Sequence, residues 1–340
     1  MKTLRFAIAG AGYWSRPQLA GWRELTGVEC VAIYNRTRSK AETLAREFAV
    51  PAVYDSVEEL LEGESLDFLD IITSVETHAP LVFQAADRRL PVVCQKPLAV
   101  SLAEAEQMIA RCRAAGVPLL VNENWRWQTP LRELHRVLVA GTIGGVFRAR
   151  LDYCNSYPVF ENQPFLRELE QFILTDVGTH LLDAARFLFG EAVALTCRTH
   201  QVNRGIRGED AATVLLDMAS GATVTCNLSY ASRLEHDQFP ETFALLEGER
   251  GSIELGPDYW LRVTTQDGTH ARRCPPPYYG WVDPRLAVVQ ASIVDCQRDL
   301  LNALRTGAPA ATDANDNLRT LKLVFAAYDS AASGDRIRLV

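Results

Sequence analysis

Residues 4–15 read LRFAIAGAGYWS, a short apolar run followed by a glycine-rich turn and the start of a helical pattern. The turn has the form G-x-G-x-x-G, with Ser15 in the place of the third glycine. Gly10 permits the tight turn, and Gly12 lets the backbone approach a pyrophosphate at the N-terminus of the helix. Serine is small enough for the packing role of the third position. The stretch therefore predicts a dinucleotide site, with a plain tight turn as the alternative.

Strand-like and helical segments alternate from this stretch to residue 123. In the last helical segment, Ser101 stands where an N-cap is expected and Gly116 where the helix should end. Such alternation is typical of a parallel sheet covered on both faces, here a doubly wound Rossmann domain. The expected strands are 4–10, 29–35, 52–54, 67–73, 91–95 and 118–123, and the expected helices are 18–25, 39–48, 56–63, 81–89 and 101–116.

The second half of the chain has longer, half-exposed apolar patterns that favour an open, mainly antiparallel sheet. Hairpin turns are expected at 219–223 and 248–252. The sequence thus predicts an α/β protein with two domains, residues 1–123 for the nucleotide and 124–340 for the substrate. The expected strands of the second domain are 146–157, 212–219, 222–231, 242–255 and 259–268, with helices at 178–189 and 288–307.

The composition excludes several classes of function. The 340 residues carry a formal net charge of -7 that is spread along the chain, which argues against nucleic acid or an anionic membrane as partner. No apolar run reaches the ~18 residues that a membrane span needs. The eight cysteines form no C-x-x-C pair, so we expect no metal site but reduced thiols in a cytoplasmic protein.

The segment after the second strand bears on the choice of cofactor. About twenty residues past the glycine turn, a carboxylate would bind the adenosine ribose of NAD. This chain has Asn35 there, followed by Arg36, Thr37, Arg38 and Lys40. A basic cluster would attract the ribose phosphate of NADP, unless these side chains only face solvent. The sequence therefore predicts NAD or NADP as the cofactor, without a choice between them.

Three motifs, GAGYWS, QKPLA and DVGTHLLD in this order, resemble the Gfo/Idh/MocA family of sugar and cyclitol oxidoreductases. The resemblance covers essentially the whole chain, including the closing DRIRLV. It implies a sugar substrate and a C-terminal sheet that forms the interface of a homodimer or homotetramer. Within the family, the chain looks most like the branch that oxidises aldoses, D-apiose among them, at C1 to the lactone. That branch uses NAD, which leaves NAD against NADP open.

Lys96 follows a buried strand, where a charge costs free energy unless something uses it. The family signature at this point is Glu-Lys-Pro, and this chain has Gln95-Lys96-Pro97. The resemblance implies that Lys96 lies beside the nicotinamide and the substrate hydroxyl, although Gln95 removes one partner of its charge. The peptide bond into Pro97 is a candidate for the cis form. A surface lysine at a strand end is the alternative.

Asp176, His180 and Asp183 share one face of the helix expected to begin at Gly178. Asp176 should precede that helix, where the dipole favours its charge, and can raise the basicity of His180. The resemblance assigns this pair to general-base catalysis, while Asp183 is expected to tie the helix to its neighbours. A capped helix with a satisfied histidine is the alternative.

The stretch 122–130, NENWRWQTP, lies at the expected domain join. Arg126 is the candidate there for binding substrate hydroxyls, with Asn124 and Glu123 as weaker ones, and an interdomain packing anchor is the alternative. The expected substrate-binding set is Lys96, Asn124, Arg126, Asp176 and His180. The expected cofactor-binding set is Gly10, Gly12, Tyr13, Trp14, Asn35, Arg36, Thr37, Arg38, Thr73, His78, Gln95 and Lys96.

Together these motifs predict an NAD(P)-dependent dehydrogenase of a sugar or polyol. His180 would take the hydroxyl proton, Asp176 would orient it, and Lys96 would stabilise the developing alkoxide. Two alternatives stay open. One is an enzyme that uses nicotinamide without net redox change, in glycoside cleavage or isomerisation. The other is a regulator that senses a sugar or NAD(P) without catalysis.

Overall fold

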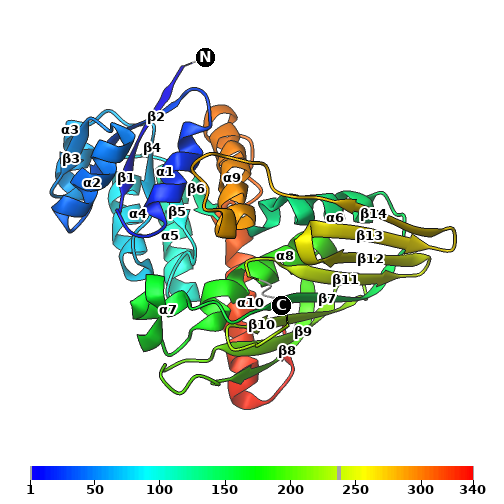
Figure 1. Ribbon diagram of the computed structural model, residues 1–340. Helices are drawn as coiled ribbons and strands as arrows, with labels where there is room; N and C mark the ends of the chain where they lie inside the picture. Colours follow the sequence, from blue (N-terminus) through cyan, green and yellow to red (C-terminus); the bar gives the residue numbers. More distant parts are fainter. Residues whose placement is uncertain (1, 236–238, 340) are drawn as a thin grey trace. The chain divides into compact units, whose positions relative to one another are not determined.

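The computed structural model describes residues 2–235 and 239–339, and the chain divides into two compact units (Figure 1). The sequence predicts a single division near residue 124. In the structure, the first unit also contains Tyr279–Val282 and Ile293–Leu321, so both C-terminal helices are divided between the units. These helices are α9 (Ala287–Thr306) and α10 (Ala314–Ser333).

The first unit is built on a six-stranded sheet in the order β3-β2-β1-β4-β5-β6, with every neighbouring pair parallel. This is the doubly wound Rossmann order, so the predicted fold of this half is confirmed. The strands are β1 (Leu4–Ala9), β2 (Val28–Tyr34), β3 (Ala52–Tyr54), β4 (Phe68–Ile71), β5 (Val92–Gln95) and β6 (Leu119–Asn122). The helices are α1 (Ser15–Arg23), α2 (Arg38–Phe48), α3 (Val57–Gly63), α4 (His78–Asp87) and α5 (Leu102–Ala115).

The burial of this sheet explains why its strands read as unbroken apolar runs. Every residue of β4, β5 and β6 is buried, as expected for a parallel sheet with helices on both faces. Helix α5 has the predicted ends, since the Ser101 side chain accepts a hydrogen bond from the Glu104 N–H and Gly116 has a φ of 72°. The strands of this unit and the ends of α5 therefore follow from their local sequence patterns.

The second unit contains a nine-stranded sheet in the order β14-β13-β12-β11-β7-β10-β9-β8-β15. Only β7 and β10 pair in parallel, so the predicted open and mainly antiparallel sheet is confirmed. The strands are β7 (Val146–Cys154), β8 (Ala192–His200), β9 (Ala211–Met218), β10 (Thr223–Ser229), β11 (Phe243–Gly248), β12 (Gly251–Gly256), β13 (Trp260–Thr265), β14 (Gly268–Arg273) and β15 (Ile337–Arg338).

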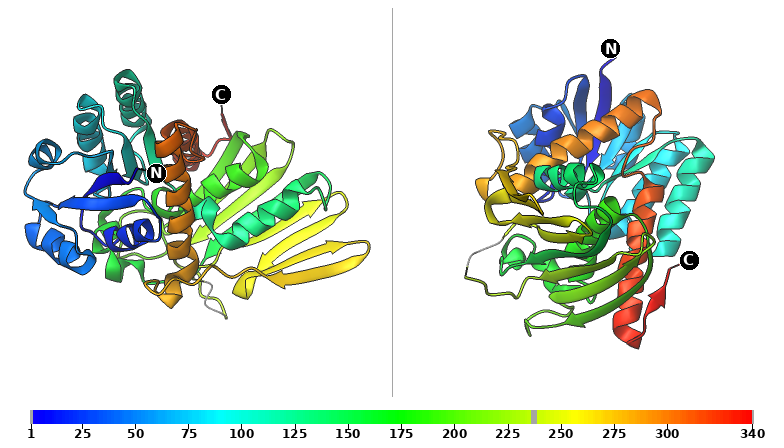
Figure 2. Two further views of the ribbon diagram at one scale, coloured as in Figure 1. Left: turned by 90° about the horizontal axis from the view of Figure 1, so that it is seen from above. Right: turned by 90° about the vertical axis from the view of Figure 1, so that its right-hand side faces the viewer.

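One face of this sheet forms the core of the second unit. Side chains alternate between buried and partly exposed along β9, β10 and β11, the pattern of a sheet with one packed face. Helices α6 (Thr129–Val139) and α8 (Thr179–Phe189) pack against it (Figure 2). The buried side chains of this face include Ala149, Leu151, Tyr153, Val214, Leu216, Val224, Cys226, Leu246 and Ile253.

Several short or unpredicted elements complete the chain. The sequence patterns do not predict β8, β14, α6 or α10. Among residues 2–235 and 239–339, no helix is both long enough and apolar enough to cross a membrane. The remaining elements are α7 (Val159–Asn162), the π-helix η4 (Leu174–Gly178), and the short 3-10 helices η1 (Val75–Thr77), η2 (Trp125–Trp127), η3 (Pro164–Glu168), η5 (Pro257–Tyr259) and η6 (Pro284–Leu286).

Candidate active site

The glycine turn after β1 has the close backbone packing that its sequence predicts. Gly10 has a φ of +119°, and a Cβ there would lie 2.3 Å from the Ile72 carbonyl oxygen at the end of β4. Only glycine fits that position without strain. Ser15 is fully buried, and its hydroxyl accepts a hydrogen bond from the Gly12 N–H at 3.0 Å. Serine thus replaces the third glycine and also closes the turn.

The turn fits a dinucleotide. A Cβ built on Gly12 would meet no atom within 4 Å, so the backbone here is open to a pyrophosphate. The turn leads into the N-terminus of α1 and lies between β1 and β4, where the strand order reverses and such folds bind nucleotides. Tyr13 is 42% exposed, with its ring edge-on to Trp14 at 5.3 Å between centroids.

The predicted ribose-binding segment is held against the glycine turn. Asn35 Oδ1 accepts a hydrogen bond from the Ala11 N–H at 3.0 Å, and Asn35 Nδ2 donates to the Thr37 carbonyl at 2.9 Å. Arg38 forms ion pairs with Glu42 at 2.9 Å and with Asp55 at 2.6 Å. These two carboxylates therefore offset the positive charge of Arg38, which the sequence predicts would attract a ribose phosphate.

Asp55 follows β3 and was not identified from the sequence. Arg36 is exposed in the loop between β2 and α2. Because Arg38 already faces two carboxylates, the local charge is less positive than the sequence alone suggests. The binding roles of Asn35, Arg36, Thr37 and Arg38 remain predictions.

His78 begins α4 and is buried, with both ring nitrogens near backbone carbonyls. Its Nδ1 lies 3.2 Å from the Leu98 oxygen, and its Nε2 lies 3.3 Å from the Thr73 oxygen. Burial lowers the pKa of His78 below its usual value, so the ring is neutral at physiological pH. The histidine connects the loop after β4 to the turn after β5. Direct contact of Thr73 or His78 with a cofactor remains a prediction.

The Gln95-Lys96-Pro97 segment lies at the carboxyl end of β5, on the edge of the sheet where such folds bind ligands. The peptide bond between Lys96 and Pro97 is cis, as anticipated. Gln95 Oε1 accepts a hydrogen bond from the Lys96 backbone N–H at 2.8 Å, and the Lys96 side chain is half-buried. The residue that replaces the family glutamate therefore contacts the lysine backbone.

In the second unit, Asp176 lies inside a π-helical turn that runs directly into α8. The prediction that Asp176 precedes a helix beginning at Gly178 is therefore wrong, because the helical backbone already begins at Leu174. A π turn contains about one residue more than an α turn, so α-helical spacing applies only from Thr179 onward. π turns of this kind are frequent at functional sites.

The π turn is held by residues that are distant in sequence. The buried Glu209 carboxylate accepts hydrogen bonds from the Phe172 and Leu174 N–H groups at 3.1 Å, which stabilises the N-terminal end of the turn. The Tyr328 hydroxyl donates to the same carboxylate at 2.7 Å. The Asp176 N–H donates to the Phe172 carbonyl at 2.9 Å. Glu209 had no motif in the sequence that singled it out.

Aromatic side chains contact both residues of the predicted catalytic pair. The imidazole of His180 is stacked on the Trp125 indole, with ring centroids 4.5 Å apart and an interplanar angle of 16°. The Tyr230 hydroxyl donates a hydrogen bond to Asp176 Oδ2 at 3.2 Å. His180 and Trp125 are both buried, with 6% and 3% of their surface exposed. The second unit thus brings Asp176 and His180 into one aromatic environment.

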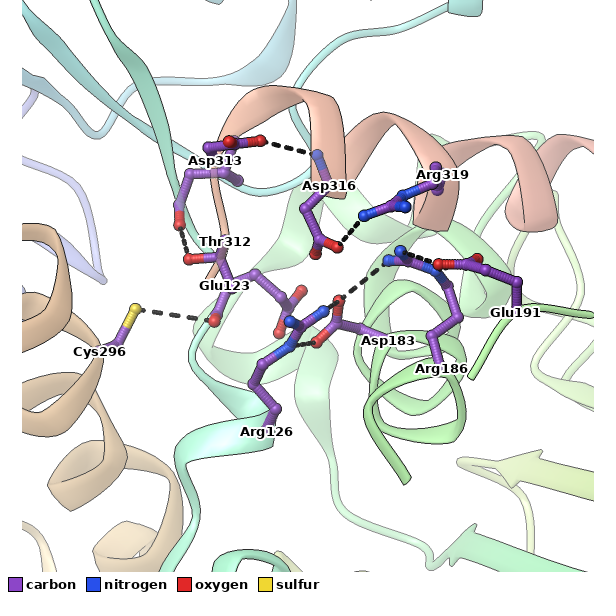
Figure 3. A network of polar contacts seen from close by, with 11 residues as sticks. Glu123, Arg126, Asp183, Arg186, Glu191, Cys296, Thr312, Asp313, Asp316 and Arg319 are labelled. Carbon is purple, nitrogen blue, oxygen red and sulfur yellow. Dashed lines mark hydrogen bonds and ion pairs between the residues drawn. The ribbon is translucent and has the colours of Figure 1, made fainter. Parts of the chain in front are cut away.

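Arg126 lies in the same unit, but its guanidinium is engaged in a buried ion pair. Its Nε donates to Asp183 Oδ2 at 2.6 Å and its other end reaches the second oxygen, as Figure 3 shows. Arg186 lies 3.8 Å from Asp183 and pairs with Glu191 at 2.8 Å. Asp183 therefore ties α8 to its neighbour, as expected, while substrate contact through Arg126 remains a prediction. Asn124 is buried at the end of the first unit's N-terminal segment.

Comparison with known proteins agrees with this geometry. Residues 4–123 match the oxidoreductase family with an NAD-binding Rossmann fold, GFO_IDH_MocA, and residues 131–254 match the GFO/IDH/MocA C-terminal domain. A D-apiose dehydrogenase of Paraburkholderia graminis is 40% identical over 100% of this chain and 90% of its own length. A D-apiose dehydrogenase of Rhizobium rhizogenes is 38% identical over 98% of this chain and 97% of its own.

Among solved structures, an oxidoreductase from Agrobacterium radiobacter in complex with NAD+, L-tartaric acid and magnesium has a TM-score of 0.97. It is 38% identical in sequence, and the match covers 99% of this chain and 98% of that one. The family match spans both units, and the residues of the glycine turn fit the dinucleotide that the family binds. The chain therefore belongs to the Gfo/Idh/MocA family of NAD(P)-dependent oxidoreductases.

Proposed function

We propose that this protein is a sugar dehydrogenase that oxidises an aldose at C1 to its lactone, with D-apiose as the leading candidate. The observation that carries this proposal is full-length similarity to two D-apiose dehydrogenases, at 40% and 38% identity. The presence of Lys96, Asp176 and His180 supports it, because these residue types supply a charge and a general base.

The first unit contributes the cofactor site and a cation. The glycine turn and the N-terminus of α1 would hold the pyrophosphate, and Asn35 the ribose, of NAD(P). NAD(P)+, when bound, supplies the chemistry of hydride acceptance. Lys96, at the carboxyl end of β5, is assigned to stabilise the negative charge that develops on the substrate oxygen.

The second unit contributes the proton acceptor. His180 Nε2 or Nδ1 takes the proton of the C1 hydroxyl, and Asp176 stabilises the imidazolium that results. The buried His180 ring is stacked on Trp125, which limits competing hydrogen bonds from water, and the Tyr230 hydroxyl donates to Asp176. The proposed division of labour is a nucleotide and a cation in one unit and a general base in the other.

The first experiment is nicotinamide reduction by the purified protein, with NAD and NADP in parallel and a panel of aldoses that includes D-apiose. Reduction with one aldose is expected, and its product should be the lactone. His180→Ala and Lys96→Ala should each lower kcat by about 10²–10⁴-fold while far-UV circular dichroism is unchanged. Full activity of either variant would contradict its assigned role. Cofactor binding without reduction by any aldose would favour an enzyme without net redox change.

We also propose that the outward face of the nine-stranded sheet forms a homodimer or homotetramer interface. A row of outward side chains crosses six strands there, by the register of the sheet. Leu215 in this row is 41% exposed, although it is apolar. The row is Leu215, Thr225, Arg150, Leu245, Glu254 and Arg262. Light scattering should give a dimer or tetramer, and Leu215→Glu should shift it toward monomer.

A further inference from the structure

Three aromatic side chains from three separate parts of the second unit gather around Asp176 and His180. Trp125 comes from η2, Tyr153 from β7, and Tyr230 from the residue that follows β10. The Trp125 ring packs against His180 on one side and edge-on to Tyr153 on another, at 4.5 and 5.5 Å between centroids. Tyr153 and Tyr230 meet edge-on at 6.1 Å. The cluster is continuous from the imidazole to the carboxylate.

The Tyr230 hydroxyl is a persistent donor to Asp176. Burial raises the pKa of Tyr230 well above its usual value, so the hydroxyl keeps its proton throughout the range in which a dehydrogenase is assayed. Burial likewise raises the pKa of Tyr153, whose ring packs edge-on to that of Tyr230. A neutral hydroxyl therefore donates to Asp176 Oδ2, which lies 3.2 Å from the Tyr230 oxygen. This hydrogen bond fixes the position of one carboxylate oxygen.

Trp125 fixes the plane of the His180 ring. Its indole N–H donates to the Thr242 hydroxyl at 2.9 Å, and Thr242 is itself buried. An indole anchored in this way cannot turn freely, so the imidazole stacked on it at 16° keeps one orientation. The face of an indole ring also attracts a cation, and His180 becomes a cation when it accepts a proton.

We infer that Tyr230 and Trp125 are positioning residues for catalysis, with Tyr230 holding the Asp176 carboxylate and Trp125 holding the His180 imidazole. This inference rests on the proposed function, in which Asp176 and His180 form the base. The two contacts should act on the proton affinity of His180 in opposite directions. The Tyr230 donor withdraws charge from Asp176 and weakens its hold on an imidazolium, whereas the Trp125 ring favours that imidazolium.

Neutral side chains face both residues of the pair. Tyr153 on β7 and Tyr230 after β10 lie near Asp176, and both stay neutral because burial raises their pKa. Trp125 faces His180 and carries no charge. Within α8, Asp183 is paired with Arg126 on η2 and lies near Arg186. Neither variant in the test removes a charged residue, so these ion pairs are retained.

The experiment follows the imidazole of His180 by NMR during a pH titration, with the signal assigned by its absence in His180→Ala. Tyr230→Phe should move the titration midpoint upward by about 0.5–1 pH unit, and Trp125→Leu should move it downward by a similar amount. Tyr157→Phe is the matched control, because the Tyr157 hydroxyl accepts a hydrogen bond from the Asn162 amide at 2.9 Å, whereas it is the Tyr230 hydroxyl that donates to Asp176. It should leave the midpoint unchanged.

Kinetics then separate positioning from a merely structural role. With the sugar that reduces the cofactor, kcat should fall about tenfold in Tyr230→Phe and in Trp125→Leu, with Trp125→Phe recovering most of the loss. The acidic limb of the kcat/KM profile should move as the NMR midpoint does. An unmoved midpoint in both variants, with His180→Ala inactive, would overturn the inference and leave the proposed function intact. An active His180→Ala would overturn the proposed function itself.

Discussion

Asp70 offers a quantitative test of how burial acts on the nucleotide-binding unit. Its side chain is fully buried in the middle of β4, where Oδ2 accepts a hydrogen bond from the Trp22 indole at 2.7 Å. Burial raises the pKa of Asp70 from its usual 3.8 to about 7, and the Trp22 bond offsets only part of that effect. Asp70→Asn is the informative change, because an amide has the same shape, still accepts from Trp22 and cannot ionise.

The sign of the effect follows from which state holds the proton. Between about pH 4 and pH 7 the folded protein keeps Asp70 protonated while the unfolded chain has lost that proton, so stability falls as pH rises. Above the folded pKa both states are ionised and the full penalty remains. A pKa difference of about three units corresponds to about 4 kcal/mol in the free energy of unfolding. The penalty should be absent below about pH 4.

The assay is urea denaturation of wild type and Asp70→Asn at several pH values, followed by tryptophan fluorescence. As the pH rises from about 4 to about 8, the free energy of unfolding of Asp70→Asn should increase relative to that of the wild type by up to about 4 kcal/mol. The nearby Cys30 and Cys94 thiols stay neutral in this range, since burial raises the pKa of both. Asp87→Asn, at an exposed ion pair with Arg111, is the control. Parallel pH dependences in wild type and Asp70→Asn would refute the reasoning.

Three further predictions concern single contacts. Arg126→Ala removes the nearer guanidinium from the buried Asp183 and should lower the free energy of unfolding by about 3–5 kcal/mol in urea denaturation, whereas Arg126→Met with Asp183→Leu should recover most of it; equal losses in the two variants would contradict this. Asp55→Asn removes one carboxylate from Arg38 and should raise kcat/KM with NADP relative to NAD by about 3–10-fold, and an unchanged ratio would show that Arg38 does not reach a ribose phosphate. Gly10→Ala places a Cβ 2.3 Å from a carbonyl oxygen and should weaken NAD binding at least about tenfold in a fluorescence titration, which retained affinity would disprove.

The elements that follow from local chemistry were predictable from the sequence. The strands of the first sheet are fully buried and short, so they read as apolar runs, and α5 carries both of its caps in the sequence. The alternation of the second sheet is equally local. Helix α10 was not predicted, although its start carries a capping residue: Asp313 accepts a hydrogen bond from the Asp316 N–H. That cap is a local signal from which the start of the helix could be predicted.

The contacts that complete the candidate site were not predictable, because they join residues far apart in the chain. Tyr230 reaches Asp176 across 54 positions, and Arg126 reaches Asp183 across 57. Asp55 can offset the charge of Arg38 only because β3 lies beside β2 in the sheet. Strand order determines these pairs, and a single sequence contains no local pattern that reports it.

Because of the π turn before α8, the geometry of the candidate site depends on the number of residues in this segment. Such a turn is an α-helical turn with one residue added, and Leu174–Gly178 would otherwise continue α8 without interruption. Loss of one residue there would let the segment become a regular helix, and every side chain before the deletion would rotate by about 100° relative to those after it. Tyr230 and Glu209, fixed on other elements, would then face different partners. A homologue shortened by one residue in this turn would need a different way to hold its base.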